Sequence, residues 1–500
     1  MGADLDYSKR VLVMILWRIS PQLILLATGV AILIADISLS RRGRYAWAQI
    51  VALAGVVGAT VATVLIWGTE QRVMYVLQLD GFTCYGWMLV LGALAVLIVL
   101  SGRYLSAHVQ ERGLFYTLLM FCGLAAFFVV ASVNLIMVVL ALDFLSIISY
   151  ILTGFLHEDQ RSTEAAIKYL IYGAVVSGLM MYGFSWLYGI SGTTDYLELS
   201  SALQSFQTAD ASVLGTALFP LLILIIAGFG FKLALVPFHQ WAPDAYEGAP
   251  TVVTALLAVL PKVAGFTALI RVIMTIFPPR LTLGQMLRSP TLIVLAAVTM
   301  TFGNLTGLWQ NRLKRLMAYS GIAQSGYVLM GLALATRSGL QASVFQLSAY
   351  TISELGAFAV IVFISLWMNS DKISDFNGLY TQAPLLAVAL LVSLLSLVGI
   401  PGTAGFIGKF MLISAAIKSG AFWLALIAGI NAVIAFGYYW KIIRALFIQE
   451  SRGLDVKPKP SAVELQVLAA LSTLGLVLLG LFPSLLLPRL NSVIGVFFPL

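Results

Sequence analysis

The 500-residue sequence predicts an all-α polytopic membrane protein, and its composition and its apolar runs carry that prediction. Apolar side chains make up 60% of the residues, charged ones only 10%, and the mean hydropathy is +0.99. Soluble domains average about 25% charged residues. The apolar residues gather in runs of about 20, the length at which a helix spans a bilayer. We therefore expect about 14 transmembrane helices in one integral membrane domain covering 1–500.

The first predicted helix follows Pro21 and runs to Ile37. The preceding MGADLDYSKRVLVMILWRIS has two acids before its first bases and no small-residue cleavage pattern, so we expect a membrane helix and not a removed signal peptide. Polar and basic segments separate the later apolar runs. The predicted helices, in order, are 20–39, 46–67, 81–101, 113–131, 134–156, 164–189, 213–236, 250–276, 289–309, 313–335, 341–368, 382–401, 404–447 with a break, and 462–487.

Basic residues between the runs predict the orientation, because cytoplasmic loops carry an excess of Lys and Arg. An even number of helices places both termini on the less basic side, outside the cytoplasm. The more basic, predicted cytoplasmic side holds Arg41, Arg42, Arg44, Arg103, Arg112, Arg161, Lys168, Arg312, Lys314, Arg315, Lys372, Lys441, Arg444, Arg452, Lys457 and Lys459. The other side holds Lys9, Arg10, Arg18, Arg72, Arg271, Arg280, Arg288, Arg337, Lys418 and Arg489.

Composition also argues against several function classes. The net charge of +8 is spread along the chain, without the basic face that nucleic-acid binding requires. Cys84 and Cys122 lie in apolar surroundings without metal-ligand spacing, so neither a disulfide framework nor a zinc site is expected. The three histidines are scattered. We expect no metal and no redox cofactor in this chain.

Ionisable residues inside the predicted spans are the candidate functional residues. Each costs roughly 2.5 to 3.5 kcal/mol at a helix centre, so such residues usually mark an ion path. Asp143 lies nine residues after Asn134, a plausible helix cap, and its side chain is too short to reach the interface. Lys262 is equally central, twelve residues after Pro250. The alternative is that each is a structural partner for another buried charge.

Lys409 and Glu354 also lie within predicted spans. Lys409 lies in LVGIPGTAGFIGKF, where glycines and Pro401 interrupt the helix, and the alternative role is a lysine packed in a kink. Glu354 lies midway between Arg337 and Lys372, and the alternative role is a hydrogen-bonded structural acid.

Lys232, in GFGFKLALVPFHQWAPDAYEGAP, is less central by counting and could extend to the interface. A break at Pro237 would change that, because broken helices are tolerated in membranes only where protein or water satisfies the freed backbone groups. Transporters place such breaks at ion sites. The breaks at Pro237 and Pro401, each near a lysine, suggest two related halves. A row of one aspartate and several lysines is typical of a proton relay and not of a nucleophilic or metal site.

Three segments, GFGFKLALVPFHQWAPDAYEGAP, NLTGLWQNRLKRLMAYSGIAQSGY and LVGIPGTAGFIGKF, resemble the antiporter-like subunit N of the proton-pumping NADH:quinone oxidoreductases, respiratory complex I. The family includes plastid, cyanobacterial and mitochondrial relatives, and the resemblance runs from about residue 80 to 450. It implies two inverted five-helix repeats, helices 4–8 and 9–13, with helices 7 and 12 broken. The implied division is 1–110 for helices 1–3, 111–276 and 289–447 for the repeats, and 448–500 for the last loop and helix 14.

The resemblance also implies roles for individual residues. Asp143 matches the family's helix 5 acid, Lys232 the helix 7 lysine, Lys262 the helix 8 lysine and Lys409 the helix 12 lysine, which together move protons. Gating or structural support is implied for His239, Asp244, Glu247, Pro237, Pro401 and Gln324.

The sequence departs from the family pattern at three of these places. Asp143 replaces the usual glutamate and is one methylene shorter, which affects its reach toward Lys232. Gln324 stands where AYSSIAHSGY has a histidine, so this position cannot titrate. SELGAF replaces the usual MNLGAF, which places the carboxylate of Glu354 where the family has an amide. We hypothesise that Glu354 takes over part of the relay between Lys262 and Lys409.

The resemblance predicts a proton-translocating membrane subunit of an NADH or ferredoxin:quinone oxidoreductase, driven by quinone reduction in other subunits. FMN, iron–sulfur clusters and quinone are expected in the partner subunits. The expected partners are neighbouring antiporter-like and small membrane subunits, the peripheral electron-transfer arm and lipids. A stand-alone or Mrp-type cation/proton antiporter is the alternative, and a structural scaffold would leave the central lysines unexplained. The expected location is the bacterial plasma membrane, or alternatively the thylakoid membrane.

Overall fold

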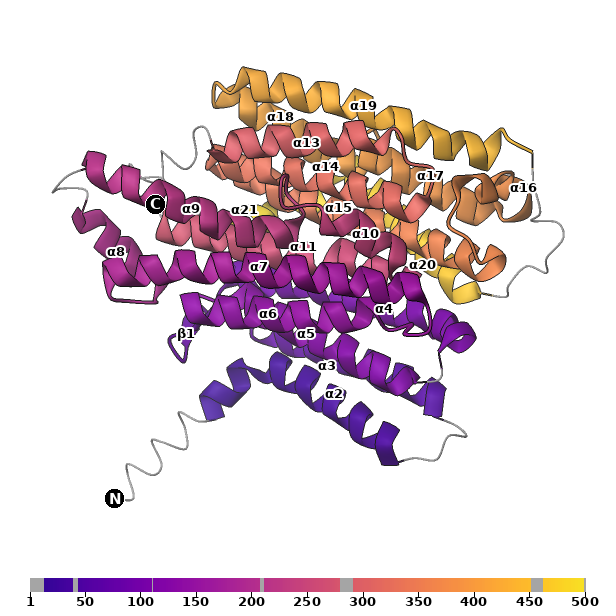
Figure 1. Ribbon diagram of the computed structural model, residues 1–500, viewed down its shortest axis with the longest axis horizontal. Helices are drawn as coiled ribbons and strands as arrows, with labels where there is room; N and C mark the ends of the chain where they lie inside the picture. Colours follow the sequence, from indigo (N-terminus) through magenta and orange to yellow (C-terminus); the bar gives the residue numbers. More distant parts are fainter. Residues whose placement is uncertain are drawn as a thin grey trace.

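The computed structural model describes residues 13–38, 44–109, 111–206, 211–278, 291–450 and 462–498, which form a bundle of roughly parallel and antiparallel helices (Figure 1). The long helices are α2 (Ser20–Ser38), α3 (Arg44–Leu65), α4 (Gly81–His108), α5 (Arg112–Ala131), α6 (Leu135–Thr153), α7 (Gln160–Ser191), α9 (Ala211–Leu233), α11 (Thr251–Ile276), α13 (Ile293–Gly307), α14 (Leu313–Leu334), α15 (Arg337–Met368), α17 (Pro384–Val398), α18 (Ala404–Lys418), α19 (Phe422–Phe447) and α20 (Val463–Leu481).

Shorter elements lie at the two ends of the bundle. The hairpin of β1 (Gln71–Val73) and β2 (Leu77–Leu79), paired antiparallel, lies near α8 (Tyr196–Phe206) at the left end in Figure 1, whereas α16 (Leu379–Gln382) lies at the right end. The other short helices are α10 (Trp241–Gly248), α21 (Leu487–Gly495), η2 (Ile373–Phe376) and η3 (Pro483–Leu485). The sequence did not predict the hairpin, α8, α10 or α21, because none has an apolar run of membrane-spanning length.

Ten helices within the described ranges are long and apolar enough to cross a membrane, and three shorter apolar helices accompany them. The prediction of an all-helical, multi-span membrane protein is therefore confirmed. Local sequence explains where several helices begin. Asn134 caps α6 by accepting hydrogen bonds from the amides of Ile136 and Met137, as its position suggested. Asp80 caps α4 by accepting from the amide of Thr83.

Helix α11 occupies the centre of the bundle. It packs against α4, α5, α9 and α15, and nearly every residue along it is buried. A helix that is apolar on all sides is expected in such a position. In contrast, α3, α7 and α20 line the outside and expose large apolar side chains such as Val57, Ile171 and Leu471. Lys262 on α11 therefore lies in the least accessible part of the protein.

One predicted division of the chain was wrong. The span predicted over 404–447 consists of two helices, because α18 ends at Lys418 and α19 begins at Phe422. Gly420 between them has a φ of 76°, a left-handed conformation that glycine adopts without steric cost and that commonly ends helices. The break was expected inside one helix, whereas α18 and α19 pack side by side as separate elements.

Candidate functional site

The first helix break lies where Pro237 predicted it. Helix α9 ends at Leu233, Ala234 follows with a φ of 53°, and α10 begins at Trp241. Protein groups satisfy the backbone that the break frees: the indole Nε1 of Trp241 donates to the carbonyl of Phe231 at 2.8 Å, and the amide of Val236 donates to Thr299 Oγ1 at 3.2 Å. The backbone groups freed by the break are therefore hydrogen-bonded within the protein, which is the condition under which a broken helix is tolerated inside a membrane.

Lys232 lies in the last turn of α9 beside this break, and its residue is 6% exposed. Its Nζ donates a hydrogen bond to the hydroxyl of Ser146 on α6. The rings of Phe231 and Tyr150 lie 5.4 and 5.7 Å from the same nitrogen. Lys232 is thus a buried ammonium held by one hydroxyl and two aromatic faces, and it does not extend to the interface.

Asp143 lies on α6 and is half-buried, with its carboxylate accepting a hydrogen bond from the hydroxyl of Ser177 on α7. Asp143 is close enough to Lys232 to interact with it electrostatically, but the hydroxyl of Ser146, three residues further along α6, accepts the hydrogen bond of the lysine. Residues three apart share a helix face. Asp143 and Ser146 therefore both lie on the side of α6 near Lys232, with Ser146 accepting from the lysine and Asp143 accepting from Ser177, an arrangement that the sequence did not predict.

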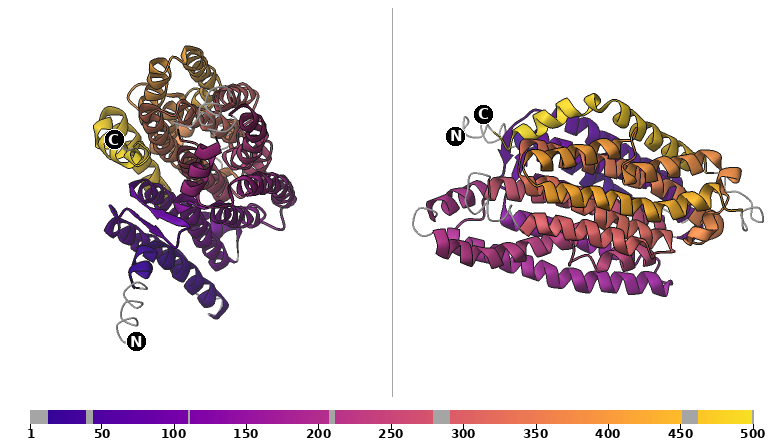
Figure 2. Two further views of the ribbon diagram at one scale, coloured as in Figure 1. Left: turned by 90° about the vertical axis from the view of Figure 1, so that its left-hand side faces the viewer. Right: turned by 90° about the horizontal axis from the view of Figure 1, so that it is seen from above.

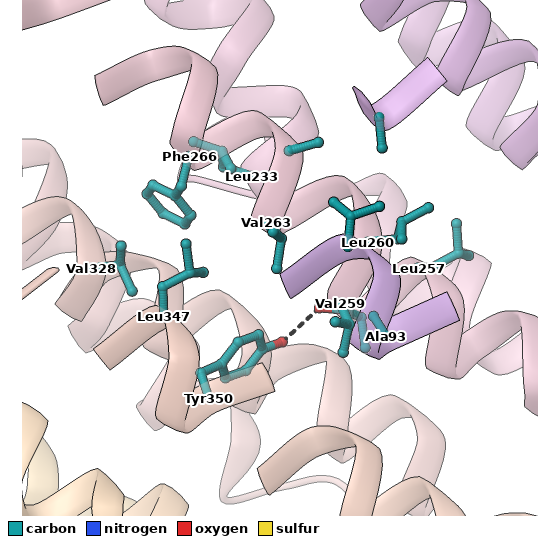
Figure 3. Close-up of a cluster of buried hydrophobic side chains, with 14 of the residues drawn as sticks. Ala93, Leu233, Leu257, Val259, Leu260, Val263, Phe266, Val328, Leu347 and Tyr350 are labelled. Carbon is teal, nitrogen blue, oxygen red and sulfur yellow. Dashed lines mark hydrogen bonds between the residues drawn. The ribbon is translucent and has the colours of Figure 1, made fainter. Parts of the chain in front are cut away.

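Lys262 is 2% exposed and its Nζ donates to the hydroxyl of Tyr350 on α15 at 2.8 Å. That hydroxyl donates in turn to the carbonyl oxygen of Ala258, one turn back on α11, at 2.9 Å. Figure 3 shows Tyr350 in this contact, surrounded by apolar side chains such as Val263 and Leu347. The lysine at the centre of the protein thus has one side-chain hydrogen-bond partner, the hydroxyl of Tyr350.

Glu354 lies one turn beyond Tyr350 on α15 and is fully buried. Neither of its carboxylate oxygens has a hydrogen-bond partner among the described residues. Lys262 is close enough to interact with it electrostatically. The structure therefore brings Glu354 to the same centre as Lys262 and Tyr350.

The second break follows α17, where Pro401 and its neighbouring glycines predicted it. Gly399 and Gly402 have φ values of 92° and 91°, and α18 begins at Ala404. Lys409, 3% exposed, donates from Nζ to the carbonyl oxygens of Leu397 at 2.7 Å and Val398 at 2.9 Å. These carbonyls end α17, and cations are favoured at a helix C-terminus.

Gln324 lies beside Lys409. Its amide nitrogen donates to the same carbonyl of Leu397 at 2.8 Å, and its amide oxygen accepts from Gln346 at 3.0 Å. The ring of Tyr327, three residues after Gln324, lies 4.3 Å from Lys409 Nζ. The non-titrating Gln324 is thus in direct contact with the backbone that holds the lysine.

The candidate support residues after the first break divide into two groups. His239 is buried with its ring against Phe302, at a centroid distance of 4.6 Å. Asp244 and Glu247 on α10 both accept from Arg315, each at 2.9 Å, and all three are partly exposed. This ion-pair group ties α10 to the start of α14, apart from the contacts of the buried lysines.

Two basic residues that the sequence assigned to opposite sides of the membrane are buried. Arg271 belongs to α11 and forms a bidentate ion pair with Asp80, with both contacts at 2.9 Å. Lys314 donates to the carbonyl of Ala249 at 2.6 Å. Both lie inside helices, as the predicted ranges 250–276 and 313–335 have them, but counting along the chain could not detect their distant partners. The predicted loop residues Arg280, Arg288, Arg452, Lys457 and Lys459 lie outside the described residues.

Ser146, Ser177 and Tyr350 could not be identified from the sequence, because isolated hydroxyls are common in apolar runs and nothing local shows which of them contacts a charged side chain. Cys84 and Cys122 are buried free thiols. Across the described ranges, no group of three His, Cys, Asp or Glu side chains is arranged to hold a metal ion.

Comparison with known proteins matches residues 132–435 to the family model described as NADH:quinone oxidoreductase/Mrp antiporter, transmembrane region. NADH-quinone oxidoreductase subunit N of Trichlorobacter lovleyi is 36% identical over 477 residues, covering 94% of this chain and 95% of the relative. NAD(P)H-quinone oxidoreductase subunit 2 of Trichodesmium erythraeum is 35% identical over 489 residues, covering 95% and 91%. A chain of respiratory complex I from Thermus thermophilus superposes with a TM-score of 0.78 and 29% identity, covering 94% of this chain and 99% of that one.

Proposed function

The chain belongs to the subunit N family of NADH-quinone oxidoreductase, the proton-translocating membrane subunits of complex I, and from that premise we propose that its protons move along a buried polar row centred on Lys262. The row comprises Asp143, Lys232, Lys262, Glu354 and Lys409. The protein is a multi-pass membrane subunit of the bacterial or thylakoid membrane.

The environment of Lys262 is the observation that carries the proposal. Its ammonium lies on the most buried helix of the bundle and donates to a single side-chain acceptor, the hydroxyl of Tyr350. An ammonium in such surroundings is costly to keep charged. Its protonation therefore depends on the charge and position of neighbouring groups, which is the property a proton carrier needs.

Lys232 and Asp143 form the row's first part. Ser146 accepts a hydrogen bond from Lys232, and Ser177 donates one to Asp143. Each of the two charged side chains is thus hydrogen-bonded to a serine hydroxyl and not to the other charged side chain. A hydroxyl can both donate and accept hydrogen bonds, so it can bridge two groups between which a proton moves. We propose that Ser146 separates the two charges in the resting state and that they approach each other when a proton moves.

Glu354, Gln324 and Lys409 form the second part. Glu354 supplies the negative charge nearest Lys262, and Gln324 shares with Lys409 the carbonyl of Leu397. The side-chain amide of Gln324 donates and accepts hydrogen bonds but does not titrate, so in this proposal it positions the end of α17. Glu354 then takes the titrating role between Lys262 and Lys409.

We further propose that 111–276 and 289–447 are two related repeats, each with one broken helix beside a lysine. Pro237 and Pro401 mark the breaks, and the first break is supported by the packing of His239 and by the ion pairs of Asp244 and Glu247 with Arg315. These groups support or gate the relay without carrying its protons.

The energy source lies in other subunits. FMN, iron–sulfur clusters and quinone are proposed there, in a peripheral electron-transfer arm and at its junction with the membrane. Neighbouring antiporter-like and small membrane subunits are the proposed direct partners in the bilayer. In this proposal the chain itself moves protons without electron transfer.

Lys262→Met in the whole complex, reconstituted into vesicles, tests the proposal. Methionine keeps the length and apolar stem of lysine but cannot bind a proton. We expect proton uptake coupled to quinone reduction to fall by at least roughly tenfold, since positioned proton-transfer groups commonly contribute more than that. Quinone reduction itself should slow because the two processes are coupled.

Lys418→Met is the matched control, because Lys418 is exposed at the end of α18. It should leave both rates unchanged. Full retention of proton uptake and quinone reduction in Lys262→Met would refute the assignment of Lys262 to the relay.

A further inference from the structure

Lys314 is a buried lysine that the proposed relay does not use. It is the second residue of α14, on the predicted cytoplasmic side, and is 8% exposed. Its Nζ donates to the carbonyl oxygen of Ala249, between α10 and α11, at 2.6 Å. In the end-on view at the left of Figure 2, the magenta helices of the first half of the chain lie next to the orange helices of the second, and α10 packs against both α7 and α14. Lys314 therefore lies where the two halves of the chain meet.

Charged side chains surround the start of α14. Arg312, directly before the helix, forms ion pairs with Glu247 at 3.3 Å and with Asp371 at 3.1 Å. The other carboxylate oxygen of Asp371, Oδ2, is buried and has no hydrogen-bond partner among the described residues. The charged groups close enough to Lys314 to interact with it electrostatically are Asp371, Glu247, Asp159 and Arg312. Three carboxylates therefore lie near this lysine on the predicted cytoplasmic side.

A polar cavity of about 230 Å³ lies beside these carboxylates. Its lining includes Glu247 and Gly248, which are the two residues before Ala249 in the chain. It also includes Arg315, the residue after Lys314. The hydrogen bond between Lys314 and Ala249 is therefore next to the cavity wall on both of the elements that it joins.

The same side of α14 leads inward to the central lysine. Gly321 lies seven residues after Lys314, which is about two turns or about 10.5 Å along the same helix face. A Cβ at Gly321 would overlap Lys262 Nζ, so this face of α14 meets the central lysine. Tyr246 on α10 is buried and close enough to Glu354 to interact with it electrostatically. Its hydroxyl, which can donate and accept hydrogen bonds, therefore lies near the central group.

We propose that Lys314 is the entry residue of the proton relay, where it takes up protons that enter through this cavity past the carboxylates and passes them toward Lys262. This inference rests on the proposed relay role of Lys262. An ammonium group can release a proton and the resulting amine can take up the next one, so Lys314 returns to its starting state after each transfer.

The alternative role for Lys314 is structural. A cation is favoured at the C-terminal end of a helix, and Ala249 follows the last residue of α10. Such a role needs the positive charge and the hydrogen bond to Ala249, but it does not need a group that titrates. The two roles therefore differ in what happens when the charge is kept and the titration is changed.

Lys314→Arg keeps the charge and the hydrogen-bond donors but cannot release a proton, because a guanidinium stays protonated in proteins. The measurement is redox-driven proton uptake by the whole complex in inverted membrane vesicles, whose cytoplasmic side faces the medium. We expect uptake to fall by at least roughly tenfold, as for the loss of a positioned proton-transfer group. Uptake equal to that of the unmodified protein would overturn the proposal.

Lys314→His gives a readout that a structural role would not change. Histidine titrates at about pH 6.5, so about three quarters of it is protonated at about pH 6 and about 3% at about pH 8, whereas lysine titrates at about pH 10.4. The uptake of this variant, divided by that of the unmodified protein at the same pH of the medium, should fall by about tenfold between these two pH values. An equal ratio at both pH values would overturn the proposal, even if uptake is lowered at each.

Lys372→His is the matched control, because Lys372 is exposed on the same predicted side of the membrane. Its uptake ratio should be close to one at both pH values. Lys262→Met, measured in the same vesicles, separates the two proposals. If Lys262→Met retains full uptake, the relay itself is wrong; if Lys262→Met loses uptake but Lys314→His shows an equal ratio at both pH values, Lys314 is not the entry residue and the relay stands.

Discussion

Glu354 is a buried carboxylate with no hydrogen-bond partner for either oxygen in the described part of the chain. Burying a charge without compensation costs several kcal/mol, so such a group persists only where an opposite charge is near or where it is neutral. Lys262 supplies the opposite charge from α11. The charge states of these two residues are therefore linked, and a proton gained by one changes the stability of the charge on the other.

Glu354→Gln tests this linkage at a single residue. Glutamine has nearly the same shape but cannot supply the negative charge, so Lys262 loses its nearest counter-ion. We expect redox-linked proton uptake to fall by up to about tenfold, the change that a loss of about 1.4 kcal/mol in interaction free energy produces. Proton uptake by the complex in vesicles is the measurement, with quinone reduction followed in parallel.

Glu198→Gln, on the exposed face of α8, is the control for that substitution and should behave as the unmodified protein. Unchanged proton pumping in Glu354→Gln would remove Glu354 from the relay. It would then be a structural acid, the alternative that its position in the sequence left open.

The helix breaks place the two outer lysines in different ways. Lys232 lies before its break, in the last turn of α9, whereas Lys409 lies after its break, on α18, and reaches back to the end of α17. Lys409 uses backbone carbonyls that the break frees, whereas Lys232 uses the hydroxyl of Ser146 on a neighbouring helix. The two lysines lie beside similar breaks but have different kinds of hydrogen-bond partner.

Helix α14 approaches the central lysine so closely that its own sequence is constrained. A Cβ at Gly321 would overlap Lys262 Nζ and lie 3.1 Å from the hydroxyl of Tyr350. Gly321→Ala should therefore displace the ammonium from Tyr350 and reduce coupled proton uptake severalfold. Alanine favours a helix by up to about 1 kcal/mol over glycine, so a folding defect is not the expected cause.

Proton uptake and thermal stability of the purified complex, measured together, check this prediction. Gly429→Ala on α19 is the matched control, because a Cβ there meets nothing within 4 Å. If the loss of proton uptake in Gly321→Ala is accompanied by a clear fall in thermal stability, or if neither quantity changes, the proposed displacement of Lys262 is wrong.

At the scale of the whole molecule, Asp80 and Arg271 connect the start of α4 to the end of α11. Their side chains are 6% and 4% exposed, and Arg271 also donates to Thr83 Oγ1 at 2.8 Å. The rings of Phe82 and Phe497 lie 5.3 and 5.8 Å from the guanidinium carbon. This contact joins the N-terminal helices, the central helix and the C-terminal segment.

Asp80→Asn should destabilise the whole protein. Asparagine can still cap α4, but it leaves Arg271 buried without a counter-charge, which typically costs about 3 to 5 kcal/mol. Arg72→Gln breaks the more exposed ion pair with Asp195 and should cost at most about 1 kcal/mol. The thermal denaturation midpoint of the subunit should fall clearly in the first variant and little in the second. Equal midpoints would show that the buried pair adds no net stability.

The sequence by itself determined the membrane fold, the candidate residues and the family. Runs of apolar residues, prolines within them and ionisable groups where none is expected are local properties, and each is visible in a short window of sequence. Lys262, Lys232, Lys409 and Glu354 could therefore be identified without coordinates, as could the breaks at Pro237 and Pro401.

Only the tertiary structure decided what these residues touch. The hydroxyl of Ser146 accepts a hydrogen bond from Lys232, the hydroxyl of Tyr350 accepts one from Lys262, and Arg271 is the buried partner of Asp80. Each of these contacts joins side chains 86 or more residues apart. A hydroxyl or a charge shows no local sign of such a partner, because packing of distant helices sets which groups meet.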